Sequence, residues 1–172
     1  MQIPVLETER LRLRGHTTDD FANSAALWSD PAVVKYIGGT PLTVEECWAR
    51  FLRYAGHWAV LGFGFWVVEE RATREFVGEV GFGNFKRAME PALNDAPELG
   101  WVLAPAKQGQ GYATEAAQAA LGWGREHFGG NAFTCVIHPE NRASLRVAAK
   151  CGFVEQHVAM YKGRPAVVFG IA

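Results

Sequence analysis

Gln108-Gly109-Gln110-Gly111-Tyr112-Ala113 lies between a strand-like run, Glu98–Leu103, and a helix-like run at residues 114–128. Glycines without a Cβ let successive backbone N–H groups face inward, and the helix that follows directs its positive dipole end to the same point. The stretch has neither the G-x-x-x-x-G-K-[ST] pattern of a nucleotide loop nor the G-x-G-x-x-G spacing of a dinucleotide fold. It therefore predicts a different kind of phosphate-binding turn.

Hydrophobic periodicity predicts further elements on both sides of this turn. Leu11 and Leu13 alternate with arginines, which is typical of a half-buried strand at residues 9–15. Thr43 and Glu46 form a capping box that predicts a helix at residues 44–58. Further helices are expected at residues 21–28, where Asp30-Pro31 ends the helix, and 141–151; strands are expected at 63–69, 76–85, Glu98–Leu103 and Phe133–Ile137, and a closing hairpin at 154–160 and 166–171.

The helix after the turn carries a narrow face of mostly small residues, which would let it lie close to a sheet. This face comprises Ala113, Ala117, Ala120, Leu121, Gly124 and Phe128. The elements together predict one α/β (α+β) domain over residues 1–172, with a mixed, mostly antiparallel twisted sheet flanked by helices.

Length and composition limit the class of protein. The 172 residues suffice for one core, and no apolar run approaches the ~20 residues that span a bilayer. The N-terminus lacks a secretory signal pattern, so we expect a cytoplasmic protein without membrane association. The net charge of −1 gives no general attraction to nucleic acid, so any anion site must be local. Cys47, Cys135 and Cys151 share no metal-ligand spacing, so we expect buried free thiols and no metal.

Three blocks of sequence resemble the GNAT N-acetyltransferase superfamily. Gln108-x-x-Gly111-x-Ala113 resembles its acyl-CoA pyrophosphate loop, whose signature is Arg or Gln, two residues, Gly, one residue, and Gly or Ala. The block from Asn141 to Phe153 resembles the helix that follows in the family, and Glu98–Leu103 resembles the strand before the loop. With the opening residues 6–14, the chain is most similar to the ribosomal-protein-alanine N-acetyltransferase branch, over nearly its whole length.

The resemblance implies a GNAT-like fold and acetyl-CoA as the acyl donor. It also implies that the strand before the loop splays from its neighbour, so that freed amides hold the pantetheine arm and the thioester carbonyl. The donor-binding residues implied are Val102, Leu103, Gln108, Gly109, Gln110, Gly111, Tyr112, Ala113, Asn141 and Ser144, with Gln108 adding its side-chain amide. A homodimer is implied as well, and the hydrophobic closing hairpin is the expected interface.

Acetyl transfer to an amine needs a proton acceptor and a donor for the leaving thiolate. Glu98 is the best candidate base, although it could instead form an ion pair at the rim of the site. His16 and His138 are alternatives, and His138 is more often a structural residue. Ser144 matches a serine proposed in the related branch to protonate the thiolate, although an ordinary helix serine is the other interpretation. Many GNAT enzymes place a tyrosine where this chain has Ala148, which favours Ser144.

Alternatives stay open for the role of Asn141 and for the function of the whole chain. Asn141 could cap its helix or reach the cofactor arm. Transfer is expected to be direct, because no Ser-His-Asp order or nucleophilic cysteine is evident. The whole chain could instead be a catalytically silent acyl-CoA-binding module, or a nucleotide-binding domain that lacks the Lys-Ser/Thr pair.

The amine acceptor is expected to bind near residues 36–41, with Trp28, Trp48, Trp58 and Trp66 as candidate walls. The other interpretation, which we favour for most of these tryptophans, is burial in the core. We find no acidic cluster that indicates a polyamine or an aminoglycoside. We also find no strongly basic patch that indicates an acidic substrate. The sequence therefore leaves two acceptors open, a protein N-terminal α-amine and a small-molecule amine.

Overall fold

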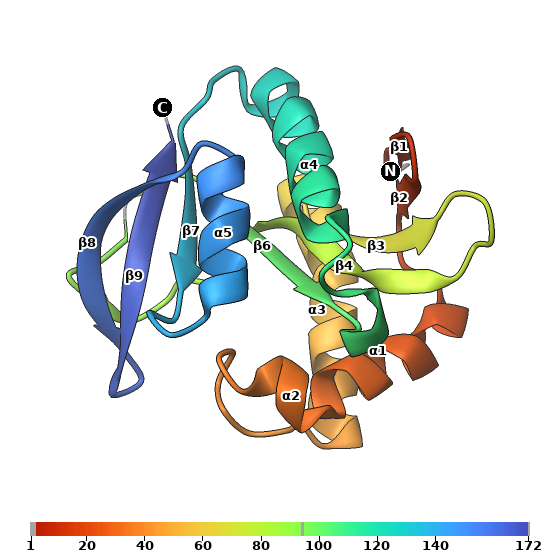
Figure 1. Cartoon of the computed structure of the whole chain (residues 1–172), viewed down its shortest axis with the longest axis horizontal. Helices are drawn as coiled ribbons and strands as arrows, with labels where there is room; N and C mark the ends of the chain where they lie inside the picture. Colours follow the sequence, from red (N-terminus) through yellow and green to blue (C-terminus); the bar gives the residue numbers. More distant parts are fainter. Residues whose placement is uncertain (1–2, 94, 172) are drawn as a thin grey trace.

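A computed structural model describes residues 3–93 and 95–171 of the chain. Its described residues form one sheet of nine strands in the order β1-β2-β3-β4-β6-β7-β9-β8-β5 (Figure 1). The strands are β1 (Leu6–Glu7), β2 (Leu11–Arg14), β3 (Phe65–Glu70), β4 (Phe76–Gly83), β5 (Met89–Glu90), β6 (Glu98–Leu103), β7 (Phe133–Ile137), β8 (Val154–Tyr161) and β9 (Arg164–Ile171). The α-helices are α1 (Phe21–Ser29), α2 (Pro31–Val34), α3 (Val44–Leu61), α4 (Tyr112–Phe128) and α5 (Arg142–Lys150).

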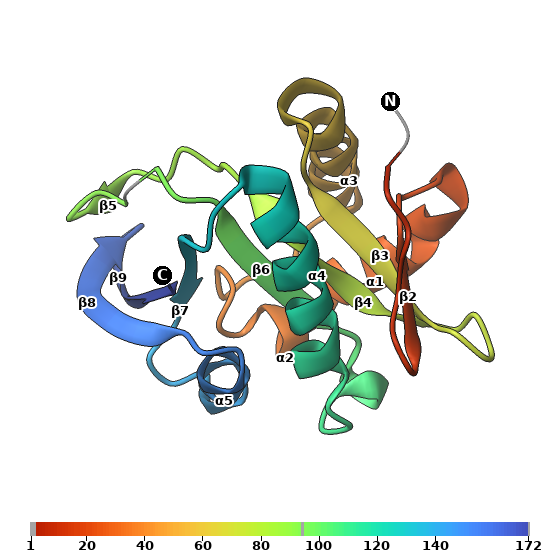
Figure 2. The same cartoon turned by 90° about the horizontal axis from the view of Figure 1, so that it is seen from above.

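Every neighbouring pair in the sheet is antiparallel except β6 and β7. These two strands run parallel and pair at one position, Glu98 with Thr134, and then diverge (Figure 1). Helices α4 and α5 lie on one face of the sheet, and α1 and α3 lie on the other (Figure 2). The predicted fold class is therefore confirmed, and the splay expected from the family resemblance is present.

Alternation along β6 separates two parts of the core. Leu99 and Leu103 pack with the alanines of α4, while Val102 packs with Trp28 and its neighbours on the opposite face. The small-residue face of α4 is confirmed at four positions, and Ala116 joins it, whereas Ala113 and Phe128 are only partly buried. At Gly124 a Cβ would lie 2.7 Å from the Phe82 ring, so glycine is required for this close approach.

Several boundaries agree with the sequence patterns. Strands β6 and β7 begin and end where predicted, and the Thr43–Glu46 capping box is present. Helix α3 continues three residues beyond the predicted end, to Leu61, and its C-cap is Gly62 in the left-handed conformation. The short elements β1, α2 and β5 were not predicted, because two to four residues carry too little periodicity. Asp30 ends α1 as expected, but its side chain also caps α2 by accepting from the Ala32 N–H at 2.8 Å.

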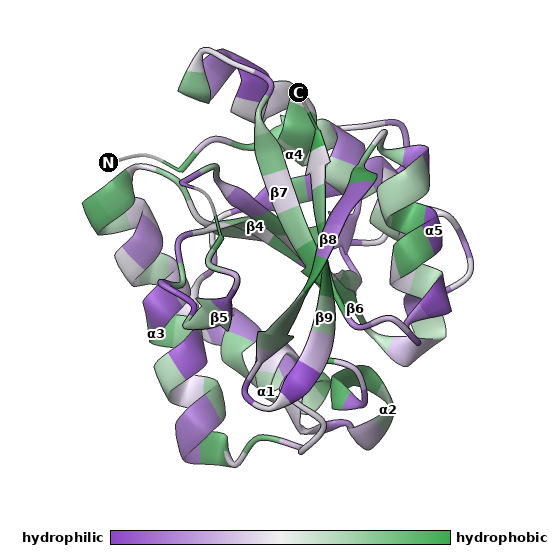
Figure 3. Ribbon diagram, turned by 90° about the vertical axis from the view of Figure 1, so that its left-hand side faces the viewer, coloured by the Kyte–Doolittle hydropathy of each residue, from purple (hydrophilic) through white to green (hydrophobic). Residues whose placement is uncertain are grey.

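The closing hairpin is longer than predicted. Lys162 and Gly163 have positive φ values of 51° and 75° and make a two-residue turn, so Arg164 already belongs to β9. Strands β7 and β9 are mainly hydrophobic, and α3 and α5 show alternating hydrophilic and hydrophobic bands, as expected for half-buried helices (Figure 3). The three cysteines are buried and free, as predicted, and burial raises the pKa of the Cys151 thiol to about 11. Among the described residues, no helix is long and apolar enough to cross a membrane.

Candidate active site

A cavity of about 370 Å³ lies where β6 and β7 separate. Its walls come from β6, β7, the start of α5, the middle of α3, residues 36–38 and the tip of the β8–β9 hairpin. Four of the predicted site residues lie together in this cavity, since its lining includes Glu98, Val102, Asn141 and Ser144. The expected acceptor region also contributes, through Tyr36, Ile37 and Gly38.

The backbone of β6 presents amide groups to this gap. Ala104 donates its N–H to the Val77 carbonyl at 2.9 Å, and the register of β4 with β6 runs without a shift. Since N–H directions alternate along a strand, the amide of Val102 also faces β4. The amides of Trp101 and Leu103 therefore face the opening. This alternation favours Leu103 and Trp101 over Val102 as backbone donors to a ligand, and Val102 contributes its side chain to the wall.

The glycine-rich turn has the predicted backbone form. Gly109 and Gly111 adopt positive φ values of 76° and 83°, and Gly111 is the N-cap of α4 without any side-chain cap. Within the described part of the chain, the backbone N–H groups of Gly109, Gln110 and Gly111 have no protein acceptor. The first N–H groups of an α-helix also have no partner within the helix. The turn thus offers several free donors and the helix dipole to an anion.

The side chains of the turn brace it instead of facing the gap. Gln108 donates its side-chain N–H to the Leu103 carbonyl at 3.1 Å, and Gln110 donates to the Ala106 carbonyl at 3.0 Å. Tyr112 donates its hydroxyl to Glu70 Oε1 at 3.1 Å. The side-chain amide of Gln108, expected to help bind the donor, is therefore hydrogen-bonded to the end of strand β6.

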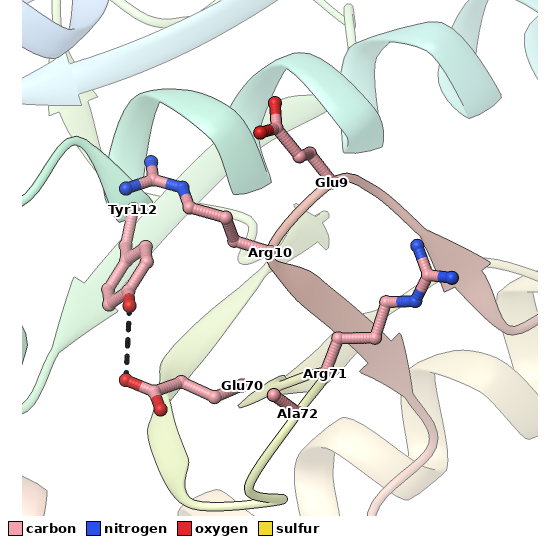
Figure 4. Close-up of a pocket in the computed structure, with 6 residues that line it drawn as sticks. All are labelled: Glu9, Arg10, Glu70, Arg71, Ala72 and Tyr112. Carbon is pink, nitrogen blue, oxygen red and sulfur yellow. Dashed lines mark hydrogen bonds between the residues drawn. The ribbon is translucent and has the colours of Figure 1, made fainter.

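Tyr112 lies in a second hollow of about 360 Å³ (Figure 4). This hollow is lined by Glu9, Arg10, Glu70, Arg71, Ala72 and Tyr112, and none of these residues lines the gap between β6 and β7. Arg10 is held there by Glu115 at 2.7 Å and by the Gln110 carbonyl at 3.0 Å. The acids and bases around this hollow balance, and its contacts support the outer side of the glycine turn.

Asn141 and Ser144 are joined at the start of α5. Asn141 Oδ1 accepts the Ser144 backbone N–H at 3.1 Å, so the helix-capping role is present. The amide NH₂ of Asn141 and the hydroxyl of Ser144 are not used in this cap, and both residues line the gap. Ala148, at the position of the family's tyrosine, is fully buried in the core. It acts as a packing residue, which leaves Ser144 as the hydroxyl on this helix beside the gap.

Glu98 forms a two-point ion pair with Arg87 inside the cavity. Arg87 Nε and Nη2 donate to the two carboxylate oxygens at 2.7 Å each, and Glu98 is 7% exposed. Burial works against the charge of Arg87, but the hydrogen bonds to Glu98 outweigh it and raise the Arg87 pKa. The ion pair that we considered as the alternative to a base is thus present, although it lies within the site and not at its rim.

The two candidate histidines have different positions. His16 lies away from the cavity, with Nε2 3.4 Å from Glu79 Oε1, so it is a structural residue. His138 lines the cavity and packs on Tyr36 with ring centroids 5.3 Å apart. Its Nδ1 lies 3.2 Å from the Glu140 N–H, which favours the tautomer that carries its proton on Nε2.

Of the four predicted tryptophan walls, only Trp28 lines the cavity. Its Nε1–H donates at 2.9 Å to the fully buried Glu79, which also accepts from Ser24 at 2.6 Å. Burial acts to raise the pKa of Glu79, but contacts with His16, Ser24 and Trp28 outweigh it and hold that pKa below its usual value. Trp58 and Trp66 are in the core, as the sequence interpretation favoured for most of these tryptophans, and Trp48 is 40% exposed on α3.

The expectation that no strongly basic patch is present was wrong. Among the described residues, five cationic side chains line the cavity against one carboxylate, that of Glu98. They are Arg50, Arg53, Arg87, Lys162 and Arg164. These residues come from three separate parts of the chain, so only the fold brings them together. In the sequence, the spacing of Arg50 and Arg53, which places them on one side of a helix, was the available signal.

Comparison with known proteins agrees with this geometry. The sequence model described as "Acetyltransferase (GNAT) domain" matches residues 10–154, so the chain belongs to the GNAT family and is an N-acetyltransferase. The uncharacterized N-acetyltransferase YoaA of Bacillus subtilis is 28% identical over 156 residues, which cover 90% of this chain and 85% of that protein. The family transfers acetyl groups from acetyl-CoA to amines.

Solved structures are similar over almost the full length. An acetyltransferase from Agrobacterium tumefaciens has a TM-score of 0.85 at 29% identity and covers 99% of this chain and 95% of its own. The ribosomal-protein-S5-alanine acetyltransferase from Vibrio fischeri has a TM-score of 0.74 at 19% identity, with 97% and 95% covered. This second likeness shows the shared fold and does not identify an acceptor.

Proposed function

We propose that this enzyme moves an acetyl group from acetyl-CoA directly to a primary amine held in the cavity between β6 and β7. One observation carries the proposal: the only parallel pair of the described sheet opens after a single position, beside the uncapped start of α4. The uncapped turn supplies free N–H donors for a pyrophosphate. The opened strand supplies amides for the thioester arm, and the turn follows this strand in the chain.

The donor site comprises the turn and the facing edges of β6 and α5. We assign the pyrophosphate to the backbone of residues 108–113, and the pantetheine arm to the amide of Leu103 together with Asn141. The side chain of Val102 closes the wall behind the arm. Ser144 is placed within the same gap, where its hydroxyl would meet the sulfur.

The reaction forms a C–N bond and breaks the C–S bond of the thioester. The amine must lose a proton, and the leaving thiolate gains one. Ser144 donates a hydrogen bond to the sulfur as negative charge develops there, which is the role that the resemblance implies. An α-amine is suited to this site, because roughly a tenth of it is neutral at pH 7, against well under one part in a thousand of a lysine side chain.

We assign Glu98 a role in accepting the proton of the amine, but not by direct contact with the amine. Both of its oxygens already accept from Arg87, so direct removal of a proton from the amine would compete with two charge-assisted hydrogen bonds. We therefore assign Glu98 to a water-relayed role, since a carboxylate has further lone pairs that can hold a water. His138, on the opposite wall, is the second candidate for this step.

The single domain over residues 1–172, the cytoplasmic location and the homodimer remain predictions from the sequence. For a dimer, the relevant surface is β8, where Val154, Val158 and Met160 are 64%, 55% and 48% exposed. The protein N-terminus and the small-molecule amine both remain acceptors of the proposed reaction.

Thermal unfolding with and without acetyl-CoA tests the donor site. A ligand at 100 times its dissociation constant stabilises a protein by about 2.7 kcal/mol, which corresponds to a rise in Tm of roughly 5–10 °C for this size. Gly111→Glu should abolish the rise, because it adds a carboxylate at the anion site and a side chain at a φ of 83°. Gly122→Glu is the matched control, since its Cβ meets no atom within 4 Å on the same helix.

Two additions make this test decisive. If Gly111→Glu does not fold, Gly109→Ala is the replacement, because it has open space for a Cβ but a φ of 76°. Release of free thiol from acetyl-CoA, measured with and without added primary amines, then tests turnover. Amine-dependent thiol release supports the proposal. A native protein that acetyl-CoA does not stabilise, or thiol release that no amine accelerates, contradicts it.

A further inference from the structure

The cations of the cavity have almost no anionic partners. Within the described residues, only Arg87 of the five cationic side chains pairs with a carboxylate. The whole chain holds 17 Lys and Arg against 18 Asp and Glu, so this imbalance is local. A concentration of unpaired cations in a concave site attracts an anion and increases its rate of binding.

Arg50 shows the lack of a partner most clearly. Its guanidinium lies over the Trp28 ring at 3.7 Å, and Nη1 is 3.4 Å from the Tyr54 hydroxyl. Its Nε is buried and has no hydrogen-bond partner among the described residues. A buried polar donor without an acceptor costs free energy unless something else satisfies it. The indole and the tyrosine hold the side chain in place without neutralising its charge.

Arg53 lies one turn further along α3 and is the least constrained of the group. Among the described residues its guanidinium has no hydrogen bond or ion pair, and its nearest aromatic contact is the Phe85 ring at 5.4 Å. Arg53 is an exposed residue, but nearby protein atoms partly desolvate its guanidinium and lower its pKa, and the positive charge of Arg50 acts in the same direction. Both effects would be relieved by an anion bound between the two guanidinium groups.

The arginines at the other end of the sheet provide an internal comparison. Arg12, Arg14 and Arg74 each contact the carboxylate of Glu69 at 2.9 Å. Arg14 also binds Asp20 at 2.8 Å. Where arginines stabilise this fold, they are therefore saturated by carboxylates. The arginines of the cavity differ, because Arg50, Arg53 and Arg164 line it without a carboxylate partner among the described residues.

The phosphates of acetyl-CoA do not account for these cations. Residues 108–113, to which we assign the pyrophosphate, are not among the residues lining the cavity. Arg50 and Arg53 are on α3, which lies across the sheet from α4, and Arg164 is at the tip of the β8–β9 hairpin (Figure 2). The tip of the hairpin closes this side, since a Cβ at Gly39 would lie 2.7 Å from Arg164 Nη1.

We infer that the acceptor is a primary amine that carries at least one carboxylate, bound by Arg50 and Arg53 with Arg164 at the hairpin tip. This inference rests on the proposed function and specifies its substrate class. The carboxylate of the acceptor fits the cationic wall, while its ammonium group lies toward Glu98, whose carboxylate is the only one that lines the cavity among the described residues. A polyamine has the wrong charge for this lining. Free amino acids and acidic peptide N-termini share the required chemistry.

The test compares initial rates of acetylation for pairs of amines that differ in charge. One pair is L-aspartate and its diamide, and the other is the peptide Ser-Glu-Glu-Ala-amide and its neutral counterpart Ser-Gln-Gln-Ala-amide, with spermidine as the cationic amine. We expect kcat/KM to be at least tenfold higher for the anionic member of one pair, and the pair that responds identifies the source. An equal or higher kcat/KM for neutral amines or spermidine, or no acetylation of any anionic amine, overturns the inference.

Arg53→Gln then tests the assigned residue, with Arg125→Gln, at an exposed position of α4, as the matched control. Arg53→Gln should raise KM for the anionic amine at least tenfold and leave the stabilisation by acetyl-CoA unchanged. Arg53→Glu should extend the loss and favour spermidine. A KM that moves equally in the control, or that does not move in Arg53→Gln, overturns the assignment. Loss of acetyl-CoA binding in the native protein would instead mark failure of the proposed function.

Discussion

The proposed donor site, here the donor side, and the proposed acceptor site, here the acceptor side, are built from different parts of the polypeptide. On the donor side the turn at residues 108–113 offers backbone N–H groups, while its side chains brace the loop. On the acceptor side, charged side chains from α3, the segment after β4 and the hairpin tip line the cavity. A backbone site depends on conformation and tolerates side-chain changes, whereas a side-chain site can change its ligand by substitution.

The largest expected effect tests whether one side chain on the donor side takes part in the chemistry. Ser144→Ala should lower kcat about 100-fold, the lower end for loss of a general acid, and leave KM for acetyl-CoA nearly unchanged. Its backbone N–H still donates to Asn141, so the helix cap is retained. Ser144→Thr, which keeps a hydroxyl, should recover part of the rate. Steady-state kinetics of the three proteins make the measurement, and an unchanged kcat in Ser144→Ala would remove Ser144 from the mechanism.

A variant with a smaller expected effect tests whether the acceptor side and the donor side act independently. Glu98→Gln leaves Arg87 without its two-point carboxylate partner, which should reduce the free energy of unfolding by about 2 kcal/mol. Turnover should fall as well, whereas the gain in stability on adding acetyl-CoA should persist, because that ligand is held from the other side. Denaturant unfolding with and without acetyl-CoA measures both quantities. If the variant loses its response to acetyl-CoA, the two sides are not independent.

The smallest effect distinguishes capping from ligand binding at Asn141. Asn141→Ala removes the cap of α5 and should cost about 1 kcal/mol of stability, while Asn141→Ser keeps a capping oxygen and should cost a few tenths. Both variants lack the side-chain NH₂, so both should bind acetyl-CoA several-fold more weakly. Unfolding experiments and titration with acetyl-CoA provide the data. Native affinity in Asn141→Ser would assign Asn141 to capping alone.

The donor side and the acceptor side also differ in how far the sequence predicts their structure. The backbone structure of the proposed donor side was predictable, because positive-φ glycines, a helix start and a strand of six residues are local patterns with physical causes. Even there, the direction of each β6 amide needed the register with β4, which separates Leu103 from Val102. The ion pair of Glu98 was foreseen only as an alternative, since its partner lies on an irregular segment.

The acceptor side was not predictable from local patterns. Arg50 and Arg87 are distant in the sequence and meet only when α3 and the segment after β4 pack beside β6. Charge balance over the whole chain also hid the basic lining, because a net charge of −1 is compatible with a strongly cationic pocket.

The most direct test of the central claim is a crystal structure of the protein with coenzyme A bound. We predict pyrophosphate oxygens within about 3.2 Å of the backbone N–H groups of residues 109–113, the usual limit for an N–H···O hydrogen bond. We also predict the sulfur between the Leu103 amide and the Ser144 hydroxyl. A coenzyme bound in the hollow beside Tyr112, or anywhere that leaves the gap between β6 and β7 empty, would contradict the account.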